Sequence, residues 1–158
     1  MTQVSFTERD VALDSGTLRV RVGGSGRPLV HLHSAAGPRV SPVVSRLAGQ
    51  HTVHQPFLPG FDGTPRHAGV TSVTGLADLV AAYIRQELDG KCDVVAESFG
   101  GWVALWLAAR VDHARLTYVY GAAHALEFDA PDRVGTIAAD FLERGESFLV
   151  RDETAARG

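Results

Sequence analysis

The sequence predicts an α/β fold whose mainly parallel β-sheet is introduced by an antiparallel hairpin. Along the 158 residues, the apolar period switches repeatedly between the alternation of a strand and the wider spacing of a helix. Alternating segments also lie on both sides of Asp14, Ser15 and Gly16, as in two strands joined by a tight turn. Strands that alternate with helices form a mainly parallel sheet. A chain of this length is about one domain long.

The first part of the chain is predicted to hold four strands and a short helix. Residues 4–24 form the hairpin. Residues 27–34 are a short apolar run that ends in small residues, as a buried strand does. A short helix is predicted over residues 42–50. Residues 51–60 are predicted as another strand, which a proline and a glycine close.

The second part is predicted to alternate helices with strands. Apolar residues recur at intervals of three and four along one helical face, at Val73, Leu76, Val80, Tyr83, Ile84 and Leu88. Residues 92–98 form a fifth strand. Residues 99–111 are apolar nearly all round, which predicts a helix buried against the centre of the sheet. Residues 115–123 predict a sixth strand. Pro131 opens a final amphipathic helix through Val134, Ile137 and Phe141.

Composition excludes several classes of function. The net charge is −3 and the charged residues are scattered along the chain, so no basic block favours a nucleic acid or a membrane surface as partner. Cys92, the only cysteine, cannot form an internal disulfide. The N-terminus lacks the basic and then apolar pattern of a signal peptide, and we expect a cytoplasmic protein. No phosphate-binding or dinucleotide-binding glycine pattern is present, so we expect no cofactor.

Ser98 lies where a buried strand turns abruptly into a buried helix, with small residues two positions away on each side, Ala96 and Gly100. A nucleophile elbow requires this pattern, because larger side chains there would collide with the neighbouring strand or helix. The turn lifts the hydroxyl above the sheet and points the backbone N–H of Phe99 at an oxygen beside it. The alternative is that Ser98 only caps the following helix, since serine is a favoured N-cap residue.

The order of elements and three motifs resemble the α/β-hydrolase family. The motifs are HLHSAAG after the third strand, PFLPGFDGTP after the fourth and AESFGG after the fifth, and the resemblance runs from about Val4 to Ala123. It implies that Ser98 is a catalytic nucleophile and that the N–H groups of Phe99 and Ala35 form the oxyanion hole. The sequence departs from the family pattern at two positions. Ser34 stands where glycine is usual, and Ala96 replaces the first glycine of the elbow.

The resemblance also suggests the chemistry. Family members that attack alkyl halides or epoxides carry aspartate at the elbow, so serine favours cleavage of an ester or a related carbonyl bond. The expected partner is therefore a small, apolar, ester-like substrate. We expect His33, Ser34, Phe61 and Trp102 to lie around the bound substrate, with the aromatic rings forming an apolar pocket.

The remaining members of a catalytic triad are difficult to place. In this family the acid and then the histidine follow the nucleophile, usually after the seventh and eighth strands. No histidine lies beyond His124, which is too early for that base. Glu127 and Asp129 occur where some members place the acid, so Asp129 is a candidate, although both also fit solvated loop positions.

We therefore expect a fold truncated before the seventh and eighth strands, which is inactive by itself if the triad histidine is missing. Residues 1–125 would form the incomplete hydrolase core, and residues 126–158 resemble the start of a helical cap. The sixth strand would then present an exposed edge through which the chain can self-associate.

Two further interpretations remain open. The first is a non-catalytic domain of the same fold that binds a ligand or a partner. The second is a metal-dependent hydrolase, because His31 and His33 alternate at a strand end as metal ligands can. We expect no metal, because later strands supply no evident further ligands; His33 is then expected to anchor the oxyanion loop by hydrogen bonds.

Overall fold

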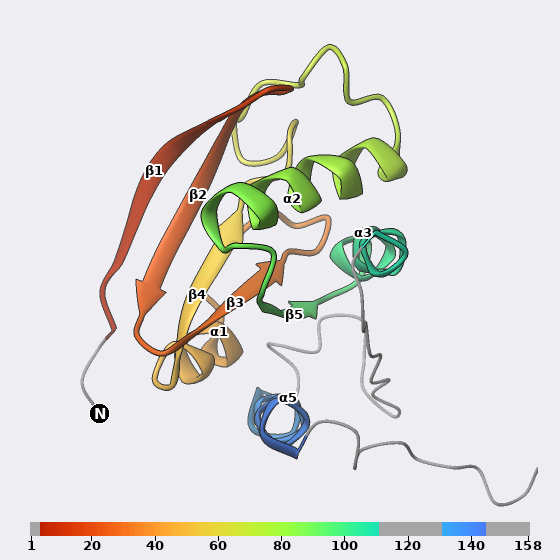
Figure 1. Ribbon diagram of the computed structural model, residues 1–158. Coiled ribbons are helices and arrows are strands. Elements are labelled where there is room, and N and C mark those ends of the chain that lie inside the picture. The colour runs from red at the N-terminus through yellow and green to blue at the C-terminus, as the bar shows by residue number, and fades with distance from the viewer. Residues whose placement is uncertain (1–3, 111–130, 145–158) are drawn as a thin grey trace, which may run out of the picture.

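The computed structural model describes residues 4–110 and 131–144. In this part of the chain a five-stranded sheet has the order β1-β2-β4-β3-β5, with helices on both faces (Figure 1). The strands are β1 (Phe6–Leu13), β2 (Gly16–Gly24), β3 (Arg27–Leu32), β4 (His51–Pro56) and β5 (Asp93–Ala96). The helices are α1 (Pro42–Leu47), α2 (Val73–Glu87), α3 (Phe99–Ala108) and α5 (Pro131–Arg144).

The predicted hairpin is confirmed, and the sheet is mixed. Strands β1 and β2 pair in antiparallel fashion from Phe6↔Gly23 to Leu13↔Gly16. Strand β2 is also antiparallel to β4, whereas β3 is parallel to both β4 and β5. The parallel part therefore consists of β4, β3 and β5, which lead to the loops that the sequence motifs occupy.

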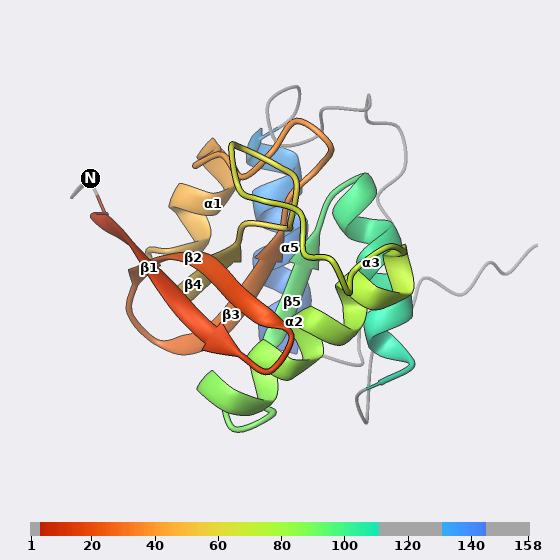
Figure 2. The same cartoon turned by 90° about the horizontal axis from the view of Figure 1, so that it is seen from above.

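Each face of the sheet buries a separate apolar cluster. Helices α2 and α3 cover one face, with Leu32, Val80 and Val103 in its core. Helices α1 and α5 cover the other face, with Leu29, Val44 and Val134 in its core (Figure 2). Successive strand residues point to opposite faces, so a strand packed on both sides carries apolar residues on both, as Leu29, Val30 and Leu32 of β3 do.

Helix starts follow the expected chemistry. The Ser41 hydroxyl accepts a hydrogen bond from Val44 N (3.2 Å), and Pro42 takes the first helical position of α1. The Ser72 hydroxyl accepts one from Gly75 N (3.1 Å) at the start of α2. In contrast, the side chain of Ser98 makes no capping hydrogen bond at the start of α3.

Helix α3 is less buried than the sequence predicts. Its inner face packs on the sheet through Gly100, Val103 and Leu107, as expected. Trp102, Leu105 and Trp106 are 55%, 56% and 43% exposed. The physical reason lies in the sheet order: β5, the strand that leads into α3, is the last strand of the described sheet, so described elements flank α3 on one side only. The expectation of a helix buried all round is therefore wrong for this face.

Helix α5 shares the core of the sheet. Val134 and Leu142 pack with Val43, Val44 and Leu47 of α1, and the Leu142 carbonyl accepts a hydrogen bond from Arg27 Nη2 (3.2 Å). The division into a core (residues 1–125) and the start of a cap (residues 126–158) stays a prediction. Val134 and Leu142, which fall in the predicted cap segment, pack into the core of the sheet. The predicted sixth strand lies outside the described residues. No helix in the described ranges is long and apolar enough to cross a membrane.

Candidate active site

Ser98 has the backbone of a strained turn. It sits between β5 and α3 with φ 49° and ψ −115°, and within the described ranges it is one of only three non-glycine residues with positive φ. A conformation of this kind costs on the order of 1–3 kcal/mol and persists only where the surrounding structure enforces it. The Ser98 side chain is exposed and does not cap α3. The interpretation of Ser98 as a simple N-cap is therefore wrong.

Gly100 is the residue that makes the turn tight. A Cβ atom at this position would lie 2.2 Å from the carbonyl oxygen of Leu32 and 2.6 Å from that of His33. The first turn of α3 thus packs directly against the backbone at the end of β3. Glu97 N reinforces this contact by donating to Leu32 O (3.1 Å). Only glycine fits here, as the sequence pattern predicted.

The loop after β3 forms a tight turn beside this elbow. Gly37 N donates to Ser34 O (3.1 Å), and the Ser34 hydroxyl accepts from Ala36 N (3.3 Å). Ala35 occupies the second position of the turn, where a backbone N–H has no partner within the turn. Ser34, which replaces the usual glycine, therefore stabilises the turn through its hydroxyl.

The two predicted oxyanion donors leave the sheet from paired positions. Leu32 of β3 is the register partner of Ala96 of β5. Ala35 and Phe99 each follow three residues later, at the same edge of the sheet. No hydrogen bond within the described ranges occupies the backbone N–H of either residue. The arrangement can direct two amides at one oxygen above Ser98.

His33 connects this turn to the loop after β4. Leu58 N donates to its Nε2 (3.2 Å), so Nδ1 carries the proton and donates to Ser34 O (2.7 Å). The ring is 1% exposed. Burial lowers the pKa of His33 below its usual value, although the Ser34 carbonyl and Asp62 act in the opposite direction. Both nitrogens are engaged within the protein, so His33 offers none to a substrate or a metal ion.

The aromatic side chains form a continuous run at the site. The ring of Phe61 lies 5.0 Å from that of His33 and 5.4 Å from that of Phe99. Phe99 in turn contacts Trp102 edge-on at 6.4 Å. The run leads from the oxyanion turn over the elbow to the exposed face of α3. Of the other predicted residues, His124, Glu127 and Asp129 lie outside the described residues.

Sequence reasoning missed a buried polar group below the site. Gln55 Nε2 lies 3.2 Å from Nδ1 of the buried His31 and donates to Arg39 O (3.0 Å). Glu97, adjacent to the nucleophile, is only 8% exposed and lines a cavity of about 20 Å³ together with His31 and His33. The available signal was a run of polar residues, including position 55, in the strand predicted over residues 51–60. In the described ranges no cluster of three or more potential metal ligands occurs.

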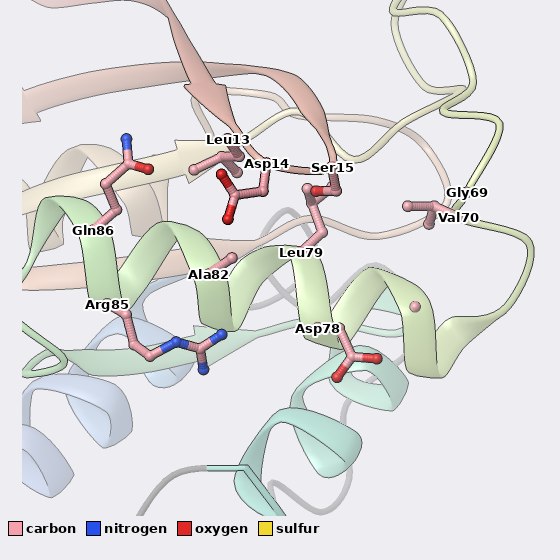
Figure 3. Close-up of a pocket in the computed structure, with 11 residues that line it drawn as sticks. Leu13, Asp14, Ser15, Gly69, Val70, Asp78, Leu79, Ala82, Arg85 and Gln86 are labelled. Atoms are coloured by element: carbon pink, nitrogen blue, oxygen red, sulfur yellow. The ribbon is translucent and has the colours of Figure 1, made fainter.

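A larger cavity of about 510 Å³ lies elsewhere (Figure 3). It opens between the β1–β2 turn, with Leu13, Asp14 and Ser15, and helix α2, with Leu79 and Ala82 among the lining residues. None of the predicted site residues lines it. The larger cavity and the candidate active site are therefore separate parts of the described structure.

Comparison with solved structures identifies the fold. The chain is similar to an N-acyl homoserine lactonase, AidH, with 22% identity, a TM-score of 0.58 and coverage of 67% of this chain and 41% of the lactonase. It is similar to the epoxide hydrolase CorEH, with 26% identity, a TM-score of 0.59 and coverage of 67% and 38%. A predicted CIB-like hydrolase from Thermoplasma acidophilum has a TM-score of 0.70 at 12% identity and coverage of 88% and 98%.

The chain thus has the α/β-hydrolase fold, which confirms the resemblance predicted from the sequence motifs. It spans about 40% of the length of the lactonase and of CorEH. No model of a protein family and no curated protein sequence matches the chain.

Proposed function

We propose that this chain carries the nucleophile and the oxyanion-binding half of a serine hydrolase that cleaves an ester or related carbonyl bond. The observation that carries the proposal is the backbone conformation of Ser98, which has positive φ. The side chain of Ser98 is exposed and makes no capping hydrogen bond to α3. The fold is that of the lactonase and epoxide hydrolase to which the chain is similar. Serine at the elbow favours an acyl-enzyme over the opening of an epoxide.

In this mechanism, a general base takes the proton of Ser98 as Oγ attacks the carbonyl carbon, the carbonyl oxygen becomes negative, and the same base then gives the proton to the leaving alcohol. The N–H groups of Phe99 and Ala35 donate to that oxygen, and the N-terminus of α3 contributes its partial positive charge. Collapse of the tetrahedral intermediate expels the alcohol and leaves an acyl-serine. Water then attacks the acyl-serine, releases the acid and regenerates the hydroxyl.

The hydrogen bonds of two buried histidines make both unsuitable as the general base. Nδ1 and Nε2 of His33 are both engaged, and Nδ1 of the buried His54 bonds the Tyr83 hydroxyl (2.7 Å). Neither ring can take the proton of Ser98 without losing these contacts. His33 therefore acts as a positioning residue, which sets the oxyanion turn relative to the loop after β4.

A fluorophosphonate probe tests the proposal, because it reacts covalently with activated serines. We expect the wild-type chain to be labelled once and Ser98→Ala to remain unlabelled. Ser45→Ala is the matched control, since Ser45 is an exposed helical serine on α1, and its labelling should equal that of wild type. Absence of labelling in the folded wild type would reject an activated serine in this chain and favour the ligand-binding alternative.

A further inference from the structure

Asp62 lies in a tight turn in the loop after β4. Thr64 N donates to Phe61 O (3.0 Å), and the two residues between them, Asp62 and Gly63, both have positive φ, 47° and 75°. Asp-Gly is a favoured pair at such positions, because aspartate adopts positive φ more readily than most residues. The turn leaves the side chain of Asp62 exposed.

Three contacts place Asp62 at the rim of the candidate active site. A Cβ atom built on Gly37, in the oxyanion turn, would lie 3.8 Å from the Cβ of Asp62. The preceding residue, Phe61, packs on both His33 and Phe99. Asp62 therefore lies beside the turn that carries Ala35, next to the aromatic ring that contacts Phe99.

In the described ranges, the carboxylate of Asp62 is exposed and makes no hydrogen bond or ion pair, and its charge acts on the nearby ring of His33. Asp10, Asp78 and Asp93 are paired with arginines, whereas Asp14 and Asp89 are exposed and unpaired in these ranges, as Asp62 is. Arg66 of the same loop lies close to Gly60 and forms no ion pair with Asp62.

An uncompensated negative charge at this position opposes the chemistry that the site is built for. The reaction develops a negative charge on the oxygen held by Ala35 and Phe99, and a nearby carboxylate raises the energy of that oxyanion. A positive charge on the substrate reverses this effect, because it is attracted to the carboxylate in the bound state. An exposed carboxylate beside the oxyanion turn is therefore suited to a substrate that carries a positive charge.

We propose that Asp62 is a specificity-determining residue that favours substrates carrying a positive charge near the reacting carbonyl, such as esters of amino alcohols. The proposal rests on the serine hydrolase function proposed above. A carboxylate at the rim acts through partly screened solvent, so we expect a modest preference of about three- to tenfold, which weakens as salt is added.

The test compares two fluorophosphonates that differ only in a trimethylammonium group and its uncharged tert-butyl counterpart. We expect the wild-type chain to react with the cationic probe about three- to tenfold faster at low ionic strength. Asp62→Asn should equalise the two rates and leave the rate with the neutral probe unchanged or higher. Asparagine tolerates positive φ, so this change preserves the loop. Asp14→Asn, an exposed aspartate in the hairpin turn, is the control and should keep the wild-type ratio.

Two other outcomes separate the two proposals. If the wild type and Asp62→Asn give the same ratio of rates, Asp62 does not select charge, and the hydrolase function stands. If neither probe labels the wild type, the hydrolase function fails and the role of Asp62 fails with it.

Discussion

Replacing Gly100 by alanine tests the packing on which the nucleophile depends. The added Cβ would lie 2.2 Å from Leu32 O and 2.6 Å from His33 O, whereas Cβ atoms essentially never come closer than 3.0 Å to such atoms. Both contacts are backbone, so no side chain can rotate away. The start of α3 and the end of β3 must separate by roughly 0.8 Å, the shortfall of the closer contact.

This separation has an energetic cost and a functional one. Overpacking a close contact costs about 2–3 kcal/mol in the free energy of unfolding. The movement also strains the hydrogen bond from Glu97 N to Leu32 O. Since a misplacement of this size costs up to about 100-fold in rate, we expect Gly100→Ala to lose most of its labelling by the fluorophosphonate probe.

Gly101 provides a matched control in the same helix. A Cβ there would meet nothing within 4 Å, so Gly101→Ala should stabilise the protein by about 0.5–1 kcal/mol through helix propensity. The two variants add the same methyl group one residue apart and should shift stability in opposite directions. In urea unfolding followed by circular dichroism, the midpoints should differ by about 1–2 M for a slope near 2 kcal/mol/M. Equal midpoints would refute the packing argument.

Two further predictions concern buried titratable groups. Burial, with a nearby arginine, lowers the pKa of His54, which bonds the Tyr83 hydroxyl. The neutral ring therefore stabilises the fold above the unfolded-state pKa of about 6.5, and this contribution is lost as the pH falls through and below that value. Urea midpoints of the wild type should drop between pH 7.5 and 5.5 by more than those of His54→Gln; an equal drop would contradict this role. Burial raises the pKa of Cys92 to about 12, so the folded chain should react slowly with a thiol reagent at pH 8 and quickly in urea. Fast reaction of the folded chain would show that the thiol is accessible.

Local patterns predicted the elements well because they depend on neighbouring residues. Alternation around Asp14 and Ser15 predicted the hairpin, and the helical apolar period that begins at Val73 predicted α2. The small residues around Ser98 predicted the elbow, because larger side chains there would collide with a neighbouring element, which the structure shows to be the end of β3. The contact of Gly100 with β3 confirms that reasoning in physical terms.

Features that depend on distant parts of the chain were not predictable in this way. The exposure of Trp102 follows from which strand ends the described sheet, and a helical apolar period carries no information on that point. The role of Gln55 depends on His31, which lies on a neighbouring strand.

The relative position of the nucleophile and the oxyanion donors follows from one strand pairing. Strand β3 leads into the turn that carries Ala35, and β5 leads into the elbow that carries Ser98 and Phe99. Their register places Leu32 opposite Ala96, and Gly100 then presses the start of α3 against the carbonyls of Leu32 and His33. His33 fastens the same turn to the loop of Phe61 and Asp62. A change in any of these contacts moves the donors relative to Ser98, so stability at the edge of the sheet and reactivity of the serine should fall together.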